Sequence, residues 1–248
     1  MKIAVAGGTG VVGHYVVEGA ERRGHDVITL SRAAGVDLMT GSAPSLAGAL
    51  QGVDVAIDVS SVQTQSAKKS EHFFGTVTER MFAAEKVAGV GHHIALSIVG
   101  SDNAPYGYYA GKALQERIVI EGSIPWTILR ATQFHEFASQ IFGQAKLGPI
   151  HVVPKMISQP IAAWEVANRL VELAENAPAG RATDLAGPEV LRMVDMVTAY
   201  VAATHARGTI LEVPLPGGFG TALRNRTLLP DSSAQLGTQT YAEWLTLL

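Results

Sequence analysis

Gly7-Gly8-Thr9-Gly10-Val11-Val12-Gly13 lies between a short apolar run at residues 3–7 and a helical pattern that starts near Val12. The apolar run is typical of a strand buried on both faces of a parallel sheet. Glycines let the backbone turn sharply and approach a pyrophosphate, whose charge is then stabilised by free N–H groups at the helix N-terminus. The stretch therefore predicts a dinucleotide-binding turn, in which the ligand contacts come from Gly7, Thr9, Gly10, Val11 and Val12.

The alternation of strand and helix patterns continues outward from this turn. The helical pattern stops near Gly24 and a second apolar run comes after it at residues 26–30, which completes one strand-helix-strand unit. Further patterns of both kinds continue in the same order, with strands at residues 36–38, 53–59, 93–97 and 126–130 and helices at residues 44–51, 70–90 and 107–122. Alternation at these lengths predicts an α/β fold of the Rossmann type, with a doubly wound parallel sheet.

The regularity fades beyond the last of these strands, where prolines separate shorter segments. We therefore expect a dinucleotide-binding core at residues 1–135 and a smaller mixed region at residues 136–248, which packs on the core and shapes a substrate pocket. Within the smaller region, residues 162–174 and the neighbourhood of Tyr200 are predicted as helices, and residues 214–235 as a loop or lid.

The composition narrows the class of protein. Of the 248 residues, 47% are apolar, which is enough to bury a sizeable core. A formal net charge of −3 offers no basic surface for nucleic acid or for an anionic membrane, and no run has the length of a membrane helix. The absence of cysteine excludes disulfides, thiolate metal sites and a cysteine nucleophile. Met1 leads straight into a strand pattern without a secretory signal, so we expect a soluble cytoplasmic protein. We also expect that it binds no metal.

The end of the second strand indicates which dinucleotide would bind. An NAD-binding protein of this fold usually carries an acidic residue there, which contacts the ribose hydroxyls. This sequence has Ser31-Arg32 instead, and a guanidinium beside a hydroxyl suits the 2′-phosphate of NADP(H). The topology also places Asp37 near the adenine, and Val59, Ser60 and Ser61 beside the nicotinamide ribose and the phosphates.

Tyr108-x-x-x-Lys112 stands at the start of the helical pattern at residues 107–122. One helical turn places a phenol and an ammonium on the same face, roughly 5 to 6 Å apart at Cβ. A cation at that position favours the phenolate. We therefore expect Lys112 to lower the pKa of Tyr108 and to prepare the phenol for proton exchange with a carbonyl or alcohol oxygen.

Several stretches resemble the atypical short-chain dehydrogenase/reductases, in particular the NmrA-like NAD(P)H-binding subgroup, over roughly residues 1–175. The matching stretches are Gly7 to Gly13, Ser97-Ile98-Val99-Gly100, Tyr108 to Lys112 with Gln115-Glu116, Leu129 to Phe134, and Gln159-Pro160-Ile161. The resemblance implies a Rossmann fold, an NADP(H) cofactor, Tyr108 as proton donor or acceptor, and Lys112 on the nicotinamide ribose. It also implies that the nicotinamide side is lined by Thr132, Gln133 and Phe134.

The third catalytic group of this family is a hydroxyl that polarises the substrate oxygen. Ser97, which ends a predicted strand, is the first candidate, although it lies only 11 residues before Tyr108. Ser101 is the alternative.

Together these features predict an NADPH-dependent oxidoreductase that transfers hydride to a small apolar carbonyl, quinone-like or enone-like acceptor. NmrA-like proteins also include redox sensors that bind the dinucleotide without turnover, commonly without the tyrosine and the lysine. A non-catalytic NADP(H)-sensing regulator is therefore the alternative hypothesis, and an epimerase or dehydratase that uses the cofactor transiently is a third.

Overall fold

A parallel sheet forms the middle of the first of two units in the computed structural model, which describes residues 1–248. This unit comprises residues 1–130 and 163–183. Its strands are β1 (Lys2–Ala6), β2 (Asp26–Leu30), β3 (Val55–Asp58), β4 (His92–Ile98), β5 (Trp126–Ala131) and β9 (Gly180–Arg181). The order is β2-β1-β3-β4-β5, with β9 beside β5, so the chain leaves β1 in both directions. Open sheets bind ligands at such a switch point, beyond the carboxyl ends of the strands.

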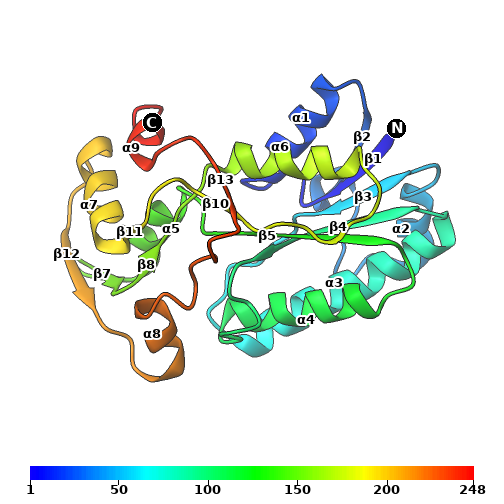
Figure 1. Ribbon diagram of the computed structural model, residues 1–248. Helices are drawn as coiled ribbons and strands as arrows, with labels where there is room; N and C mark the ends of the chain where they lie inside the picture. Colours follow the sequence, from blue (N-terminus) through cyan, green and yellow to red (C-terminus); the bar gives the residue numbers. More distant parts are fainter. The chain divides into compact units, whose positions relative to one another are not determined.

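Helices cover both faces of this sheet. They are α1 (Gly13–Arg22), the short 3₁₀ helix η1 (Arg32–Ala34), α2 (Ala43–Ala49), α3 (Ala67–Ala88), α4 (Tyr108–Glu121) and α6 (Ala163–Ala174). Figure 1 shows α1 and α6 side by side on one face and α3 and α4 on the other, and the two helices of each pair pack against each other. The predicted doubly wound α/β fold is therefore confirmed.

One predicted strand is absent. Residues 36–38 form no strand and lead into a turn at residues 38–40, because the Asp37 carboxylate accepts hydrogen bonds from the N–H groups of Met39 (2.8 Å) and Thr40 (3.1 Å). Gly35 adopts a φ of 79° just before it, in the left-handed region that ends η1. Bonds from a side chain to its own neighbouring backbone compete with a sheet ladder, so the sheet ends at β2.

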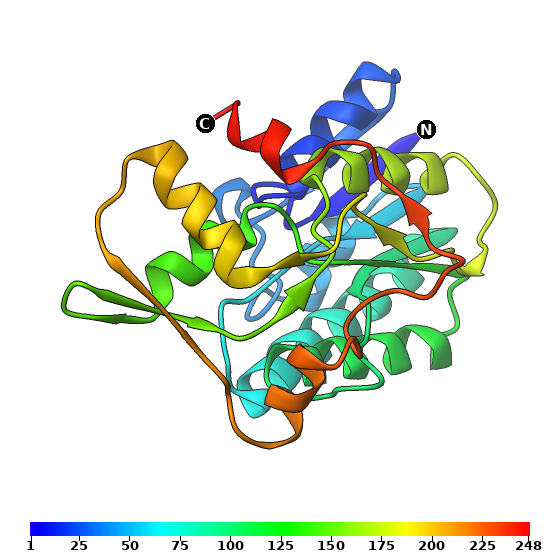
Figure 2. The same ribbon diagram turned by 60° about the vertical axis from the view of Figure 1, so that its left-hand side comes forward.

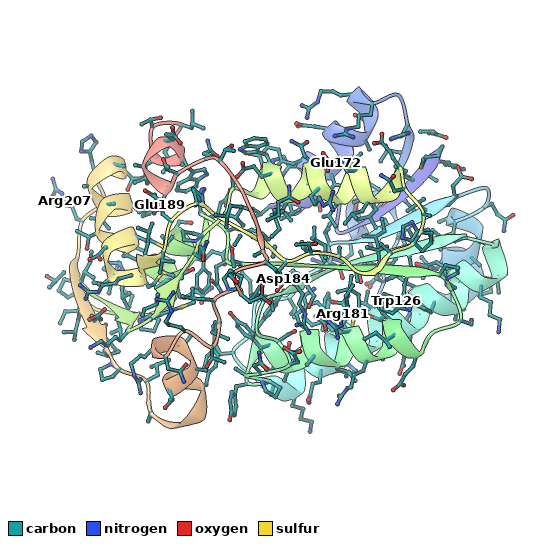
Figure 3. The ribbon with its side chains drawn as sticks, in the orientation of Figure 1. Trp126, Glu172, Arg181, Asp184, Glu189 and Arg207 are labelled. Atoms are coloured by element: carbon teal, nitrogen blue, oxygen red, sulfur yellow. The ribbon has the colours of Figure 1, made fainter.

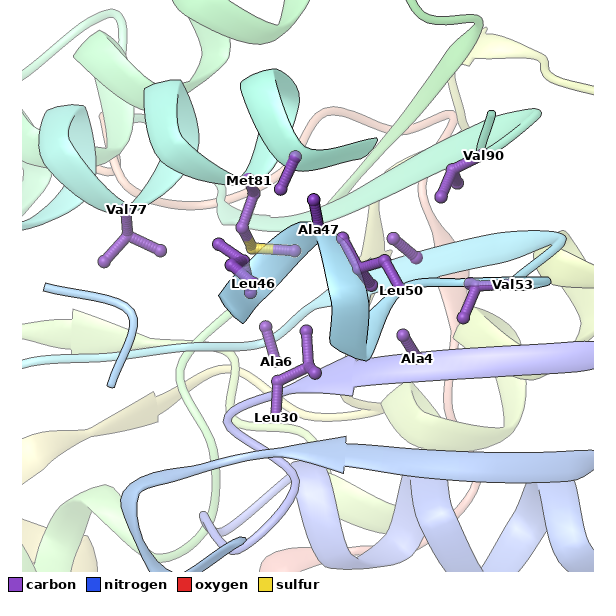
Figure 4. Packing of buried hydrophobic residues seen from close by; sticks show 12 residues of the cluster. Ala4, Ala6, Leu30, Leu46, Ala47, Leu50, Val53, Val77, Met81 and Val90 are labelled. Carbon is purple, nitrogen blue, oxygen red and sulfur yellow. The ribbon is translucent and has the colours of Figure 1, made fainter. Parts of the chain in front are cut away.

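The face of the sheet under α2 and α3 holds a cluster of buried apolar side chains (Figure 4). On the sheet the cluster begins with small residues, Ala4 and Ala6 of β1, which let the helices approach closely. Leu50, at the end of α2, and Met81 of α3 fill the space above them, and both are fully buried. This packing holds β1 and the turn after it in place, because dispersion and burial both favour the closed arrangement.

The second unit comprises residues 131–162 and 184–248. Its helices are α5 (Phe137–Gln144), α7 (Met193–Thr204), α8 (Gly217–Arg224) and α9 (Tyr241–Leu245). Its strands are β6 (Lys146–Leu147), β7 (Ile150–Pro154), β8 (Ile157–Ser158), β10 (Leu185–Ala186), β11 (Leu191–Arg192), β12 (Thr209–Val213) and β13 (Gln235–Leu236). β7 pairs antiparallel with β6 and parallel with β12, and Figure 2 shows this β6–β7 hairpin next to α5.

Two features of the smaller region differ from the prediction. Residues 214–235 contain the helix α8, which buries Ala222 and Leu223, so this stretch is not only a loop. The helix α6, predicted as part of the smaller region, packs against α1 and belongs to the first unit. The chain therefore crosses between the units more than once and is not divided by the single boundary expected after residue 135. No helix combines the length and apolarity needed to cross a membrane.

Truncating a side chain of the apolar cluster tests this packing. We expect Leu50→Ala to lower the free energy of unfolding by about 2 to 5 kcal/mol, because it leaves a cavity in a fully buried position. Val87→Ala, at a side chain that is 74% exposed, is the matched control and should change it by less than about 0.5 kcal/mol. Denaturant unfolding followed by circular dichroism measures both, and equal effects would contradict the assigned core.

Candidate active site

The glycine turn after β1 is shaped by backbone contacts that leave no room for side chains. Gly7 has a φ of 82°, and a Cβ on it would lie 2.8 Å from the Cα of Ser60. A Cβ on Gly13 would collide with the carbonyl oxygen of Gly7, which also accepts a 2.9 Å hydrogen bond from the N–H of Gly10. These glycines are therefore required by the geometry of the turn itself.

The start of α1 presents unpaired backbone donors. Val12 stands at the N-cap position with no side-chain cap, and the first turn holds no acidic residue. The N–H groups of Thr9, Val11 and Val12 make no hydrogen bond within the chain, and Thr9 and Val11 are exposed. A helix start with free N–H groups and no local carboxylate attracts an anion such as the pyrophosphate of a dinucleotide. The turn thus fits the ligand predicted from its sequence.

Ser31 and Arg32 come directly after β2, at the same end of the sheet. The Ser31 hydroxyl accepts a 3.2 Å hydrogen bond from the N–H of Ala34 and so caps η1. Arg32 begins η1, is exposed, and forms no ion pair. Hydrogen bonds within its turn lower the pKa of Asp37, and the charge of Arg32 adds to this effect. The Arg32 guanidinium is therefore available to bind a phosphate, and Asp37 is the carboxylate on which its charge acts.

The segment after β3 lies directly against the glycine turn. Val59 donates its N–H to the carbonyl of Ala6 at 3.0 Å, and the Cα of Ser60 is the atom that a side chain on Gly7 would strike. The Asp58 carboxylate, fully buried, accepts the N–H of Ser60 at 2.9 Å. The structure thus brings together Gly7, Val59 and Ser60. From the sequence, these residues were predicted to lie at the same edge of the sheet on the basis of topology alone.

Tyr108 stands at the first position of α4. Gly107 before it has a φ of 54°, and a Cβ there would lie 3.1 Å from the carbonyl oxygen of Gln65. The Tyr108 hydroxyl and the Ser61 hydroxyl are 3.1 Å apart, and the Tyr108 ring meets the Phe74 ring edge to face at 5.4 Å. The phenol therefore contacts Ser61, and the neighbouring residue Ser60 contacts the glycine turn.

The pKa of Tyr108 is raised to about 12, so the expectation that it is lowered is wrong. Burial is the main cause, because it disfavours the phenolate. The hydrogen bond with Ser61 opposes this shift, and the negative charge of Asp58 adds to it. At neutral pH the group is a protonated phenol, which is the form that donates a proton.

Lys112 does not reach the phenol. Its Nζ donates to the carbonyl oxygen of Leu96 at 2.8 Å and to the Gln115 side-chain oxygen at 2.9 Å, and it lies 4.1 Å from the centroid of the Phe74 ring. Burial lowers the pKa of Lys112 to about 8, although the charges of Asp58 and Glu116 oppose the shift. These contacts explain why the lysine, one helical turn from Tyr108, does not stabilise its phenolate here.

Ser97 and Ser101 lie beside the buried carboxylate of Glu116. Arg130 binds this carboxylate through two hydrogen bonds of 2.8 and 2.7 Å, Arg181 (labelled in Figure 3) donates at 2.8 Å, and the Ser101 hydroxyl donates at 3.1 Å. Burial alone would raise the pKa of Glu116, but the bonds from Arg130 and Arg181 lower it to about 2. Ser61, and neither of the two predicted serines, is the hydroxyl in hydrogen-bond contact with Tyr108.

Gln133 and Phe134 belong to the second unit. The Ser158 hydroxyl donates to the side-chain oxygen of buried Gln133 at 2.6 Å, and Phe134 forms a parallel β-bridge with Ile161. Thr132 donates its hydroxyl to the carbonyl of Gln159 at 2.6 Å. Their predicted place beside the nicotinamide stays a prediction.

Three residues of the first unit have contacts that were not predicted: Ser61, Asp58 and Gln115. Ser61 was predicted beside the nicotinamide ribose and the phosphates, but its contact with Tyr108 was not. No local pattern could reveal the other two, since the Gln115 amide meets the Asp58 carboxylate from a position 57 residues away in the chain.

Comparison with known proteins identifies the family and similar folds. A family model described as NAD(P)H-binding matches residues 7–177. The chain is similar in structure to the NADPH-dependent quinone oxidoreductase QOR2 of Escherichia coli solved with NADPH, with 19% identity, 99% of each chain covered and a TM-score of 0.69. It is also similar to the UDP-N-acetylglucosamine 4-epimerase of Bacillus cereus (16% identity, 100% of this chain and 96% of that chain, TM-score 0.69). A third similar structure is TunA, an NAD-dependent NDP-hexosamine 5,6-dehydratase (15% identity, 99% and 95% covered, TM-score 0.72). No curated protein matches the chain.

A methyl group in the glycine turn tests the predicted phosphate contact. We expect Gly13→Ala to weaken NADPH binding by roughly tenfold or more, because the displaced turn loses charge-assisted hydrogen bonds to the pyrophosphate. Gly48→Ala, on an exposed face of α2 with open space around the glycine, is the control and should leave the affinity unchanged. Titration calorimetry with NADPH measures both, and full affinity in Gly13→Ala would exclude the turn as the phosphate site.

The choice between the two dinucleotides can be tested at Arg32. We expect Arg32→Ala to weaken NADPH binding by roughly tenfold to a hundredfold, because it removes charge-assisted hydrogen bonds to the 2′-phosphate. NADH carries no such phosphate, so its affinity should hardly change. Arg117→Ala, at another exposed arginine, controls for the loss of one positive charge. Equal losses for the two dinucleotides would refute this role of Arg32.

Proposed function

Because the chain belongs to the NAD(P)H-binding family, we propose that it is an NADPH-dependent oxidoreductase, which transfers hydride to a small carbonyl, quinone-like or enone-like acceptor. The observation that carries this proposal is the place of the Tyr108 phenol. It contacts Ser61, and the adjacent residue Ser60 lies against Gly7 of the phosphate turn. A proton donor is thereby held at the edge of the sheet where a bound dinucleotide would end.

The choice of NADPH over NADH rests on Arg32. The position after β2 carries a free guanidinium where an NAD-binding site of this fold would carry a carboxylate. A planar guanidinium matches the oxygens of a 2′-phosphate, whereas it gains little from a neutral hydroxyl.

The residues of the chain indicate which group would supply the proton in this reaction. Bound NADPH would supply the hydride. The Tyr108 O–H would donate its proton to the acceptor oxygen, so that one carbonyl takes up a hydride and a proton and becomes an alcohol. The Ser61 hydroxyl, in contact with the Tyr108 oxygen, would stabilise the phenolate that is left, and solvent would return the proton. A phenol with a pKa of about 12 favours this reductive direction, because it is fully protonated near neutral pH.

The contacts of Lys112 favour a second candidate function, that of a non-catalytic NADP(H) sensor. Its ammonium contacts Leu96 and Gln115 and does not face the phenol, so the tyrosine and lysine do not form a coupled pair in this structure. A non-catalytic protein that senses NADP(H) occupancy would need the dinucleotide site but no such pair.

Removing the phenolic oxygen tests the oxidoreductase directly. We expect Tyr108→Phe to lower kcat for NADPH oxidation by about 100-fold to 10,000-fold with a panel of quinones, enones and aldehydes, because the general acid is lost. NADPH affinity should stay within about threefold, since the ring and its packing on Phe74 remain. Tyr106→Phe, at an exposed neighbouring tyrosine, is the matched control.

The same assay separates the alternatives. An unchanged rate in Tyr108→Phe would refute Tyr108 as the acid. Tight NADPH binding by the wild-type protein, without oxidation by any acceptor of the panel, would favour the sensor. Turnover of a nucleotide sugar without net NADPH oxidation would favour an epimerase or dehydratase.

A further inference from the structure

Gln115 joins two buried charged groups in the first unit. Its side-chain oxygen accepts a 2.9 Å hydrogen bond from Nζ of Lys112, and its amide nitrogen donates at 2.8 Å to the carboxylate of Asp58. Gln115 and Asp58 are fully buried and Lys112 is 4% exposed. A buried amide that meets a cation on one side and a carboxylate on the other can adopt only one orientation.

The contacts of Lys112 leave one donor free. An ammonium carries three N–H donors, and two of them bind the Gln115 side chain and the carbonyl of Leu96. The Phe74 ring, 4.1 Å from Nζ, closes a further side. The remaining N–H is the one that a ligand hydroxyl can take, and its direction is set by the two bonds already made.

Asp58 connects this arrangement to the phosphate turn. Its carboxylate also accepts the N–H of Ser60, whose Cα lies against Gly7. We propose that Gln115, oriented by Asp58, is a positioning residue that directs the free N–H of Lys112 toward the nicotinamide ribose. The inference rests on the proposed function, because it takes the dinucleotide as the ligand of this site.

The charged groups around Lys112 define how its affinity for a ligand depends on pH. Asp58 from β3 and Glu116 from α4 favour the ammonium, while α3 presents the Phe74 ring and β4 the Leu96 carbonyl. Asp58 also acts by its charge on Tyr108 and on the buried His93, which is bonded to Glu85. Burial lowers the pKa of Lys112 to about 8, so the ammonium is present below pH 8 and is lost as the pH rises through that value.

A ribose hydroxyl that accepts a bond from the ammonium raises the pKa of Lys112 in the complex. NADPH affinity should therefore be highest near pH 7 and should fall above about pH 8. Titrations between pH 7 and pH 10 keep the 2′-phosphate doubly charged, since its second pKa is near 6.

The decisive experiment compares Gln115→Met in two backgrounds. In the wild-type background we expect NADPH affinity at pH 7.5 to fall roughly tenfold, because the ammonium loses its fixed acceptor, and the decline with pH to begin at a lower pH. In the Lys112→Met background the same substitution should change the affinity less than about twofold, because there is no ammonium left to direct. Gln51→Met, at an exposed glutamine, is the matched control.

Each outcome of these titrations decides the inference. An equal loss in both backgrounds would show a merely structural effect of Gln115 and would overturn it, as would an unchanged affinity and pH dependence. If the wild-type protein does not bind NADPH at all, the proposed function fails and the inference with it. Should Gln115→Met not fold, Gln115→Asn replaces it, since a side chain one methylene shorter cannot bridge Lys112 and Asp58 and should give the same loss only when Lys112 is present.

Discussion

The close approach of Gly7 to Ser60 is the constraint on which the rest of the site depends. With 2.8 Å between the Cα of Ser60 and the position of a Cβ on Gly7, the ends of β1 and β3 can meet only because no side chain stands between them. This contact exists at the point where the chain leaves β1 in opposite directions, so topology and glycine geometry act together. From this point Ser61 reaches Tyr108 and Asp58 reaches Gln115, so these two polar contacts of α4 start from the same backbone segment.

Burial, more than the spacing of charges, determines the protonation states in this site. Tyr108 and Lys112 stand one helical turn apart, yet the pKa of the phenol is raised to about 12 and that of the lysine is lowered to about 8. Both shifts favour the uncharged form, as desolvation requires. Glu116 shows the opposite balance, because Arg130 and Arg181 supply enough hydrogen bonds to keep its carboxylate charged despite burial. The Glu116 carboxylate is therefore charged near neutral pH and Tyr108 is a neutral phenol, while Lys112 keeps its charge below about pH 8.

The order of the elements and the phosphate turn were predictable from the sequence because they depend on local patterns. The apolar run at residues 26–30 matches β2, and the glycines at positions 7 and 13 are explained by contacts within the turn. The run at residues 36–38 was predicted as a strand and forms none, because the side chain of Asp37 accepts hydrogen bonds from the following backbone N–H groups in place of a sheet partner. The return of α6 to the first unit and the direction of the Lys112 ammonium could not be predicted, because each depends on partners far away in the sequence.

The two functional hypotheses share their binding chemistry and differ in the fate of the bound dinucleotide. Either function needs the glycine turn, the free guanidinium of Arg32 and an ammonium directed by neighbours. In either, a bound dinucleotide adds negative charge beside a lysine with a lowered pKa and so favours its ammonium form. Tyr108 is a protonated phenol near neutral pH in either case, which matters only if an acceptor oxygen reaches it. The distinction between enzyme and sensor therefore lies in access to the Tyr108 hydroxyl, because the dinucleotide site and the protonated phenol are the same in both.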